Sequence, residues 1–206
     1  MYIELLDNLR CVADHPQIPL VTAITDRDGR FVVTATMGCP TCKREYPIEN
    51  GIACFTSPKS AIHPPVASTA TREEAIRLAA FLDVSEGGVI ALVGACATQS
   101  VEVAALNGAR IFAVNSPAVL DESDRVGLIR AGKRLPFAEG ALRGIAIDEP
   151  DWNSGDVEVA AHALGPGGRV VLPLTVELPP VLQEIARDDA IRVAEKRGPL
   201  VALQRR

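Results

Sequence analysis

Val89-Ile-Ala-Leu-Val-Gly-Ala-Cys-Ala-Thr98 is the stretch that decides the fold of most of the chain. Its first five residues are apolar and predict a short buried strand that ends at Gly94. Periodic apolar residues at 100–107 predict a helix, and a second apolar strand is predicted at 110–114. A strand, a glycine turn, a helix and a further strand form the repeating unit of a parallel α/β sheet.

The same alternation continues on both sides of this unit. Residues 71–82 predict a helix that begins with a capping box formed by Thr71 and Glu74. The pattern further predicts helices at 123–129, 156–164 and 179–186 and strands at 144–148, 169–174, 190–195 and 200–204. The tight connection between the last two strands favours antiparallel pairing. We therefore expect an α/β body at residues 71–206, with a mostly parallel sheet that closes in an antiparallel hairpin.

Composition and charge narrow the classes of protein to consider. The 206 residues are 48% apolar and 23% charged, which allows a packed core for one medium domain and a small partner. The net charge of -5 argues against indiscriminate binding to nucleic acids or anionic membranes. No apolar run approaches the roughly 18 residues of a membrane span. The first residues lack the basic and apolar regions of a signal peptide, so we predict a cytoplasmic location.

Cysteines divide the chain into two parts. Four of the five, all except Cys96, lie within the first 54 residues. The odd number and the missing secretion signal argue against a disulfide framework. We predict a cysteine-rich head at 1–57, a linker rich in Pro, Ser and Thr at 58–70, and the α/β body after it.

The head contains the ligand pattern of a zinc site. Two strand-like runs joined by an Asp-Gly turn lead into Cys39-Pro-Thr-Cys42, which has the C-x2-C spacing of a zinc knuckle. Cys11 and His15 lie just before this hairpin and complete the four ligands that tetrahedral zinc requires. Antiparallel strands that bring two ligand-bearing turns together are typical of a zinc ribbon. We predict a structural zinc ion at these four residues.

Other interpretations of the same residues remain open. The C-x2-C pair can be a redox pair, His15 a surface residue before a proline, and Cys11 a buried thiol at a helix end. Cys54 lies in an apolar run and is predicted to belong to the core rather than to the metal site.

The head also resembles a known family. Residues 5–11 (Leu-Leu-Asp-Asn-Leu-Arg-Cys) and 39–52 (Cys-Pro-Thr-Cys-Lys-Arg-Glu-Tyr-Pro-Ile-Glu-Asn-Gly-Ile) are similar to the small zinc-ribbon proteins that activate RNA and protein methyltransferases. The first ligand pair departs from that family, because a C-x3-H pair stands where C-x2-C is usual. The resemblance implies a zinc-ribbon domain beside a methyltransferase.

The body resembles the class I methyltransferases that depend on S-adenosylmethionine (SAM). Residues 135–140 (Leu-Pro-Phe-Ala-Glu-Gly) and 163–171 (Ala-Leu-Gly-Pro-Gly-Gly-Arg-Val-Val) are similar to two motifs of that family. The resemblance implies a Rossmann-like fold with SAM bound at the carboxyl ends of the strands. The cofactor-binding positions that it implies are Gly94, Cys96, Thr98, Asn115, Pro136, Phe137 and Asp148.

Several of these positions depart from the family pattern. Gly94 is the only glycine left of the G-x-G-x-G loop, and Asn115 stands where an acidic residue binds the ribose. Ala131 replaces the aspartate that receives the adenine amino group. Charge-assisted hydrogen bonds contribute about 1.5–3 kcal/mol each, so losing several would lower the affinity for SAM by orders of magnitude.

These observations lead to three hypotheses about function. The first is a methyltransferase-like pseudoenzyme with a structural zinc ribbon and a degraded SAM site, which acts by binding a partner protein or a second copy of itself. The alternative is an active SAM-dependent methyltransferase of unknown substrate. A third hypothesis is association with RNA through Arg10, Lys43 and Arg44 of the head. We expect no association with membranes.

Overall fold

The computed structural model describes residues 1–56, 71–84, 88–120 and 123–198. The predicted linker at 58–70 lies outside these residues. The strands are β1 (Val21–Asp28), β2 (Phe31–Gly38), β3 (Glu45–Glu49), β4 (Ile52–Cys54), β5 (Val89–Gly94), β6 (Arg110–Val114), β7 (Val126–Arg130), β8 (Leu142–Asp148), β9 (Leu164–Pro173), β10 (Leu182–Arg187) and β11 (Ile191–Lys196). The helices are α1 (Ile3–Leu6), α2 (Arg72–Phe81), the 3-10 helix η1 (Ala95–Gln99), α3 (Ser100–Asn107) and α4 (Ser154–Ala161).

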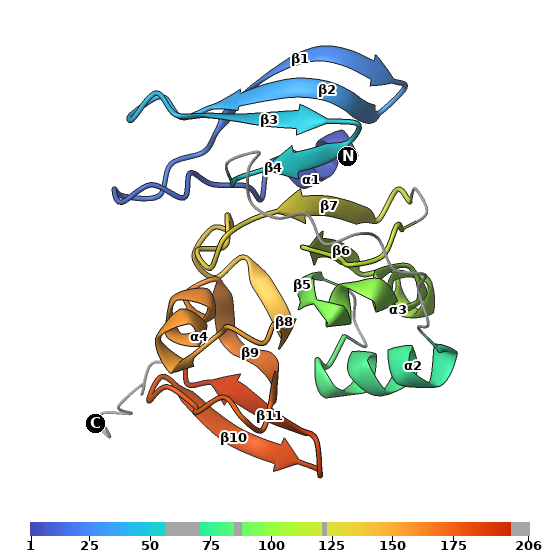
Figure 1. The fold of residues 1–206 in the computed structure, drawn as a ribbon, viewed down its shortest axis with the longest axis vertical. Coiled ribbons are helices and arrows are strands. Elements are labelled where there is room, and N and C mark those ends of the chain that lie inside the picture. Colours follow the sequence, from blue (N-terminus) through green and yellow to red (C-terminus); the bar gives the residue numbers. More distant parts are fainter. Residues whose placement is uncertain (57–70, 85–87, 121–122, 199–206) are drawn as a thin grey trace, which may run out of the picture.

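All of these strands join one sheet, which runs from β1 at one end of the molecule to β10 at the other (Figure 1). The strand order is β1-β2-β3-β4-β7-β6-β5-β8-β9-β11-β10. Strands β7, β6, β5, β8 and β9 are parallel to one another, whereas β11 pairs antiparallel with both β9 and β10. Counted from β5, the body strands are therefore ordered third, second, first, fourth, fifth, seventh, sixth.

This order is doubly wound, and the direction of winding reverses between β5 and β8. The fold is an α/β fold of the Rossmann-like methyltransferase type, with a C-terminal antiparallel hairpin, so the predicted fold class is confirmed. In such sheets ligands bind outside the carboxyl ends of the strands at the reversal point. The fold thus directs attention to the ends of β5 and β8.

Helices cover both faces of the sheet. Helices α2 and α3 pack through Leu78 and Val103 onto one face, which includes Ile90 and Leu92 of β5. The opposite face of β5 belongs to a second core, which α1 and α4 share. Because both faces of β5 are buried, the strand is a continuous apolar run in the sequence. None of the described helices is long and apolar enough to cross a membrane.

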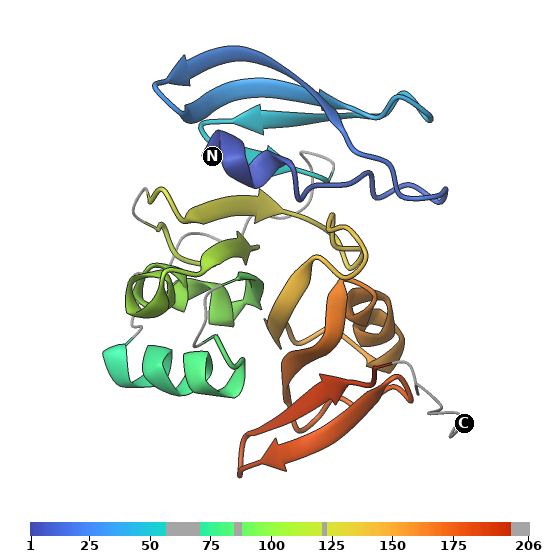
Figure 2. The same ribbon diagram turned by 180° about the vertical axis from the view of Figure 1, so that it is seen from behind.

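The head joins the body through the sheet itself. Strands β1 to β4 form an antiparallel meander, and β4 then pairs parallel with β7 through Ile52 opposite Leu128 and Cys54 opposite Arg130. Helix α1 lies beside β4 and β7 (Figure 2), and its Leu5 is 1% exposed. Head and body therefore share one hydrophobic core. The division into domains at 1–57 and 71–206 stays a prediction.

Two predicted helices are strands in the structure. Residues 123–129 were expected to be helical, but β7 occupies 126–130 because it pairs with β4 on one side and β6 on the other. Residues 179–186 were also expected to be helical, but β10 forms at 182–187 by pairing with β11. Among the described residues, the antiparallel hairpin that closes the sheet is β10–β11. Of the strands predicted at 190–195 and 200–204, the first corresponds to β11, and the second lies outside the described residues.

Candidate functional sites

The four predicted metal ligands lie together. The ligand atoms of Cys11, His15, Cys39 and Cys42 are all within 4.8 Å of one another. The Sγ atoms of Cys11 and Cys42 are 3.6 Å apart, and Sγ of Cys39 lies 3.4 Å from Nε2 of His15. Zinc bonds of about 2.3 Å to sulfur and about 2.0 Å to nitrogen place tetrahedral neighbours roughly 3.5–3.8 Å apart. The donor set and its spacing fit a tetrahedral zinc ion.

Backbone pairing positions the two halves of this Cys/His cluster. Strand β2 leads into the knuckle turn, where the N–H of Lys43 donates to the carbonyl of Cys39 and the N–H of Cys39 donates to Arg44. The residue before Cys11 is fixed as well, because the N–H of Arg10 donates to the carbonyl of Pro136. The first ligand pair is thus held against the body, and the second lies at the end of a strand of the head.

Neighbouring groups orient the ligand atoms. Nδ1 of His15 lies 2.7 Å from the carbonyl oxygen of Pro16. A proton on Nδ1 satisfies this contact and leaves the lone pair of Nε2 directed at the cluster. The hydroxyl of Tyr46 lies 3.1 Å from Sγ of Cys11. Burial raises the pKa of Tyr46 to about 12, so its hydroxyl stays protonated and can donate to the sulfur.

The electrostatics favour thiolate at Cys39 and Cys11. At Cys42 the backbone hydrogen bond with Arg44 lowers the pKa, but burial and the neighbouring sulfurs of Cys11 and Cys39 raise it overall. Burial raises the pKa of Cys39, but the backbone N–H groups of Cys42 and Thr41 outweigh it and lower the pKa to about 6. Burial likewise raises the pKa of Cys11, but hydrogen bonds from Tyr46 and from the backbone lower it overall. Thiolate is the form of cysteine that binds zinc, so the site is prepared for a cation.

The second candidate site lies at the carboxyl ends of the body strands. Gly94 ends β5 directly opposite Asp148, which ends β8. Gly94 has a φ of 71°, and a Cβ built there would overlap the carbonyl oxygen of Asp148. The same Cβ would lie 2.6 Å from Cγ of Glu149, so the side chain of Glu149 rests against Gly94. Atoms of Asp148 and Glu149 thus lie against Gly94 on the side to which a side chain would point.

Asn115, which follows β6, is tied to the segment after β7. Its Nδ2 donates to the carbonyl of Ala131 at 2.9 Å, and the N–H of Ala131 donates to its Oδ1 at 3.0 Å. Nδ2 also lies 3.3 Å from Oε1 of Glu149. The side chain that the resemblance assigns to ribose recognition is therefore hydrogen bonded within the protein.

The remaining predicted cofactor residues have other surroundings. Cys96 and Thr98 lie in η1. Burial and the charge of Asp148 raise the pKa of Cys96 to about 12. The hydroxyl of Thr98 donates a hydrogen bond to the carbonyl of Ala95. Pro136 and Phe137 face the head, where Pro136 accepts from Arg10. The ring of Phe137 is 1% exposed and packs 4.9 Å from that of Phe112.

Glu149 also belongs to this site. It contacts Gly94 and Asn115, although it is not among the cofactor-binding positions that the resemblance implies. Its place directly after a buried strand was the only available signal, because carboxyl ends of parallel strands meet at one edge of a sheet. The structure therefore brings Gly94, Asn115, Asp148 and Glu149 together.

Several solved methyltransferase structures are similar to this one. TrmN from Thermus thermophilus is 21% identical and the match covers 62% of this chain and 49% of that one, with a TM-score of 0.48. The tRNA (m1A58) methyltransferase TrmI from Aquifex aeolicus is 12% identical over 64% of this chain and 71% of its own, with a TM-score of 0.43. An RNA methyltransferase from Salinibacter ruber, in complex with S-adenosylhomocysteine, is 16% identical. The match covers 62% of this chain and 93% of that one, with a TM-score of 0.44.

The chain thus covers about half the length of the Thermus protein. No protein-family model matches the sequence, and no curated protein matches it significantly. The fold assignment rests on the strand order described above.

Proposed function

We propose that Cys11, His15, Cys39 and Cys42 hold one structural zinc ion. Three sulfurs and one imidazole nitrogen fill a tetrahedral shell and leave no position for a reacting water, which is typical of structural rather than catalytic zinc. The metal would stabilise the head, because the free energy of binding zinc is added to the free energy of folding. The spacing of the ligand atoms supports this assignment.

We propose further that the body is a methyltransferase fold that does not use SAM. The observation that carries this proposal is the closure at the ends of β5, β6 and β8, where Glu149 rests on Gly94 and Asn115 is hydrogen bonded to Ala131. A cofactor at the reversal point would have to displace Glu149, and a ribose bound by Asn115 would compete with the hydrogen bonds to Ala131. The sequence also lacks two glycines of the loop and the acidic residues that bind the ribose and the adenine amino group in the family. Few hydrogen bonds to SAM would therefore compensate for that cost.

The protein then acts by binding, with another protein or a second copy of itself as the partner. The exposed edge of the head supports this role. β1 is the terminal strand of the sheet, and its Val21 and Ile24 are 65% and 37% exposed. An unpaired strand edge with exposed apolar side chains is a common site of protein association.

Calorimetric titration with SAM and with S-adenosylhomocysteine tests the proposal. The zinc-loaded, folded chain should show no saturable heat with either ligand up to millimolar concentration. A dissociation constant in the micromolar range for either ligand would overturn the proposal. Zinc content and circular dichroism measured on the same sample ensure that an absence of binding heat does not reflect an unfolded protein.

An active SAM-dependent methyltransferase remains the second candidate function. One observation favours it: Gly94 ends the first body strand with φ of 71°, as a glycine turn approached by a ligand would. On this view Glu149 moves aside when SAM binds. Micromolar binding in the titration would support this candidate and would justify a search for a methyl acceptor.

A further inference from the structure

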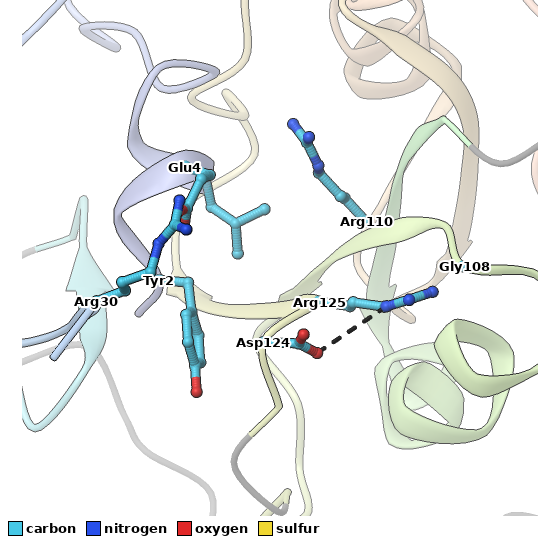
Figure 3. Close-up of a pocket in the computed structure, with 8 residues that line it drawn as sticks. Tyr2, Glu4, Arg30, Gly108, Arg110, Asp124 and Arg125 are labelled. Atoms are coloured by element: carbon cyan, nitrogen blue, oxygen red, sulfur yellow. Dashed lines mark ion pairs between the residues drawn. The ribbon is translucent and has the colours of Figure 1, made fainter. Parts of the chain in front are cut away.

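A cavity of about 410 Å³ lies at the opposite edge of the sheet from the sites described above (Figure 3). It opens between the head and the amino ends of β6 and β7. Arg110, the first residue of β6, and Arg125, just before β7, line its body side. Arg30 and Tyr2 line its head side, and Leu5 of α1 is also among the lining residues.

The backbones of the two body arginines lie side by side. The N–H of Ile111 donates to the carbonyl of Arg125 at 2.7 Å, which fixes the starts of the two strands next to each other. Arg125 lies over Gly108, because a Cβ built there would be 2.5 Å from its Nη1. Gly108 has a φ of 74° and ends α3, so a glycine is favoured here for its backbone as well.

The charges of the cavity do not cancel. Arg30 forms an ion pair with Glu4, and Arg125 lies 4.0 Å from Asp124 in a solvent-exposed pair. Such an exposed pair contributes little and leaves the guanidinium free to bind another anion. The guanidinium of Arg110 makes no hydrogen bond or ion pair with the described residues. Three arginines against two carboxylates make the lining cationic in a chain whose net charge is -5.

We propose that this cavity binds a small molecule that carries a phosphate group. The planar guanidinium groups of Arg110 and Arg125 suit the oxygens of phosphate, which they can contact in a bidentate manner. The half-buried ring of Tyr2 provides an apolar contact for the carbon skeleton of the ligand. The volume falls within the range of about 300–1,000 Å³ that is usual for small-molecule sites.

Titration with pyrophosphate and with glucose 6-phosphate, followed by calorimetry and amide NMR shifts at low salt, tests this proposal. Both phosphates should bind saturably and shift the amides of Gly108, Arg110 and Arg125, whereas glucose should do neither. Arg110→Gln should weaken binding of both phosphates at least tenfold. Arg187→Gln, on β10 at the far end of the sheet, is the matched control and should leave binding unchanged.

Failure of pyrophosphate to bind at millimolar concentration would overturn the proposal. Equal binding by wild type and Arg110→Gln would also overturn it, because the anion would then lie elsewhere. Neither probe contains adenine or methionine, so the result is independent of whether the ends of β5 and β8 bind SAM. Arg110 is exposed and begins its strand, so the substitution leaves the core intact.

Discussion

At the scale of single residues, Gly94 shows how tightly the strand ends are packed. We expect Gly94→Ala to destabilise the protein by about 3 kcal/mol or more, because its Cβ would meet the carbonyl of Asp148 and the side chain of Glu149. The control is Gly29→Ala, at a φ of 56° with no atom within 4 Å of the new Cβ. That variant should lose only about 1–2 kcal/mol, from its backbone conformation.

Urea denaturation of the two alanine variants separates the effects. Equal losses of unfolding free energy would show that Glu149 and the Asp148 carbonyl do not crowd Gly94 in solution. A larger loss in Gly94→Ala would support the closed strand ends on which the proposed function depends.

Cys39 provides the residue-scale test of the metal. Cys39→Ser removes one of four ligands, so zinc content should fall from one ion per chain to well below one, with a lower melting temperature. Cys54→Ser is the matched control, because the half-buried Cys54 lies outside the Cys/His cluster and should leave the zinc content unchanged. Elemental analysis and thermal unfolding are the measurements. A Cys39→Ser protein that keeps its zinc and its stability would refute the proposed site.

At the scale of elements, the start of α4 is sensitive to acid. The N–H of Asn153 donates to Asp156, which also accepts from Lys133 at 2.7 Å. The hydrogen bond from Lys133, and then that from Asn153, hold the pKa of Asp156 below its usual value. A lowered pKa in the folded state stabilises the protein above the unfolded value of about 3.9, and this contribution is lost as the pH falls further.

Wild type should therefore exceed Asp156→Asn in unfolding free energy by roughly 1 kcal/mol at neutral pH. The difference should shrink as the pH falls from about 5 to about 2–3. The exposed Asp151→Asn is the control. If the difference in unfolding free energy between wild type and Asp156→Asn stayed constant over this pH range, the carboxylate of Asp156 would not contribute through its charge.

Elements also show how far the sequence determines the fold. Local signals were sufficient for β5, β6 and the capped helix α2, where Thr71 and Glu74 form the expected hydrogen bonds. They failed for β7, whose strand state depends on partners about 75 and 15 residues away along the chain. They failed again for β10, an exposed edge strand whose polar Gln-Glu and Ala-Arg pairs also suit a helix.

The candidate sites divide in the same way. The C-x2-C and C-x3-H spacings were enough to name the four residues that lie together, because metal ligands must be close in space. The contacts of Glu149 with Gly94 and Asn115 could not be predicted, because they exist only after three strands have assembled. Likewise, nothing in the sequence signals that the Asn115 amide bonds to the backbone of Ala131.

At the scale of the whole molecule, the shared sheet predicts that zinc stabilises the body as well as the head. Trp152 is the only tryptophan, is 7% exposed and belongs to the body, so its fluorescence reports on unfolding of that part. Chelation of the metal should lower the Trp152 unfolding midpoint by about 10 °C or more, and added zinc should restore it. An unchanged midpoint after zinc removal would show that head and body unfold independently.

The pairing of β4 with β7 also has a consequence for synthesis of the chain. Ile52 and Leu128 are about 75 residues apart, which a ribosome translating 5–20 residues per second covers in about 4–15 seconds. All four zinc ligands leave the ribosome before β4 does, so metal can bind while the strand still lacks its neighbour. A nascent chain that is short of zinc would present a loosely held strand edge throughout that interval, and we expect this window to be when misassembly with other chains begins.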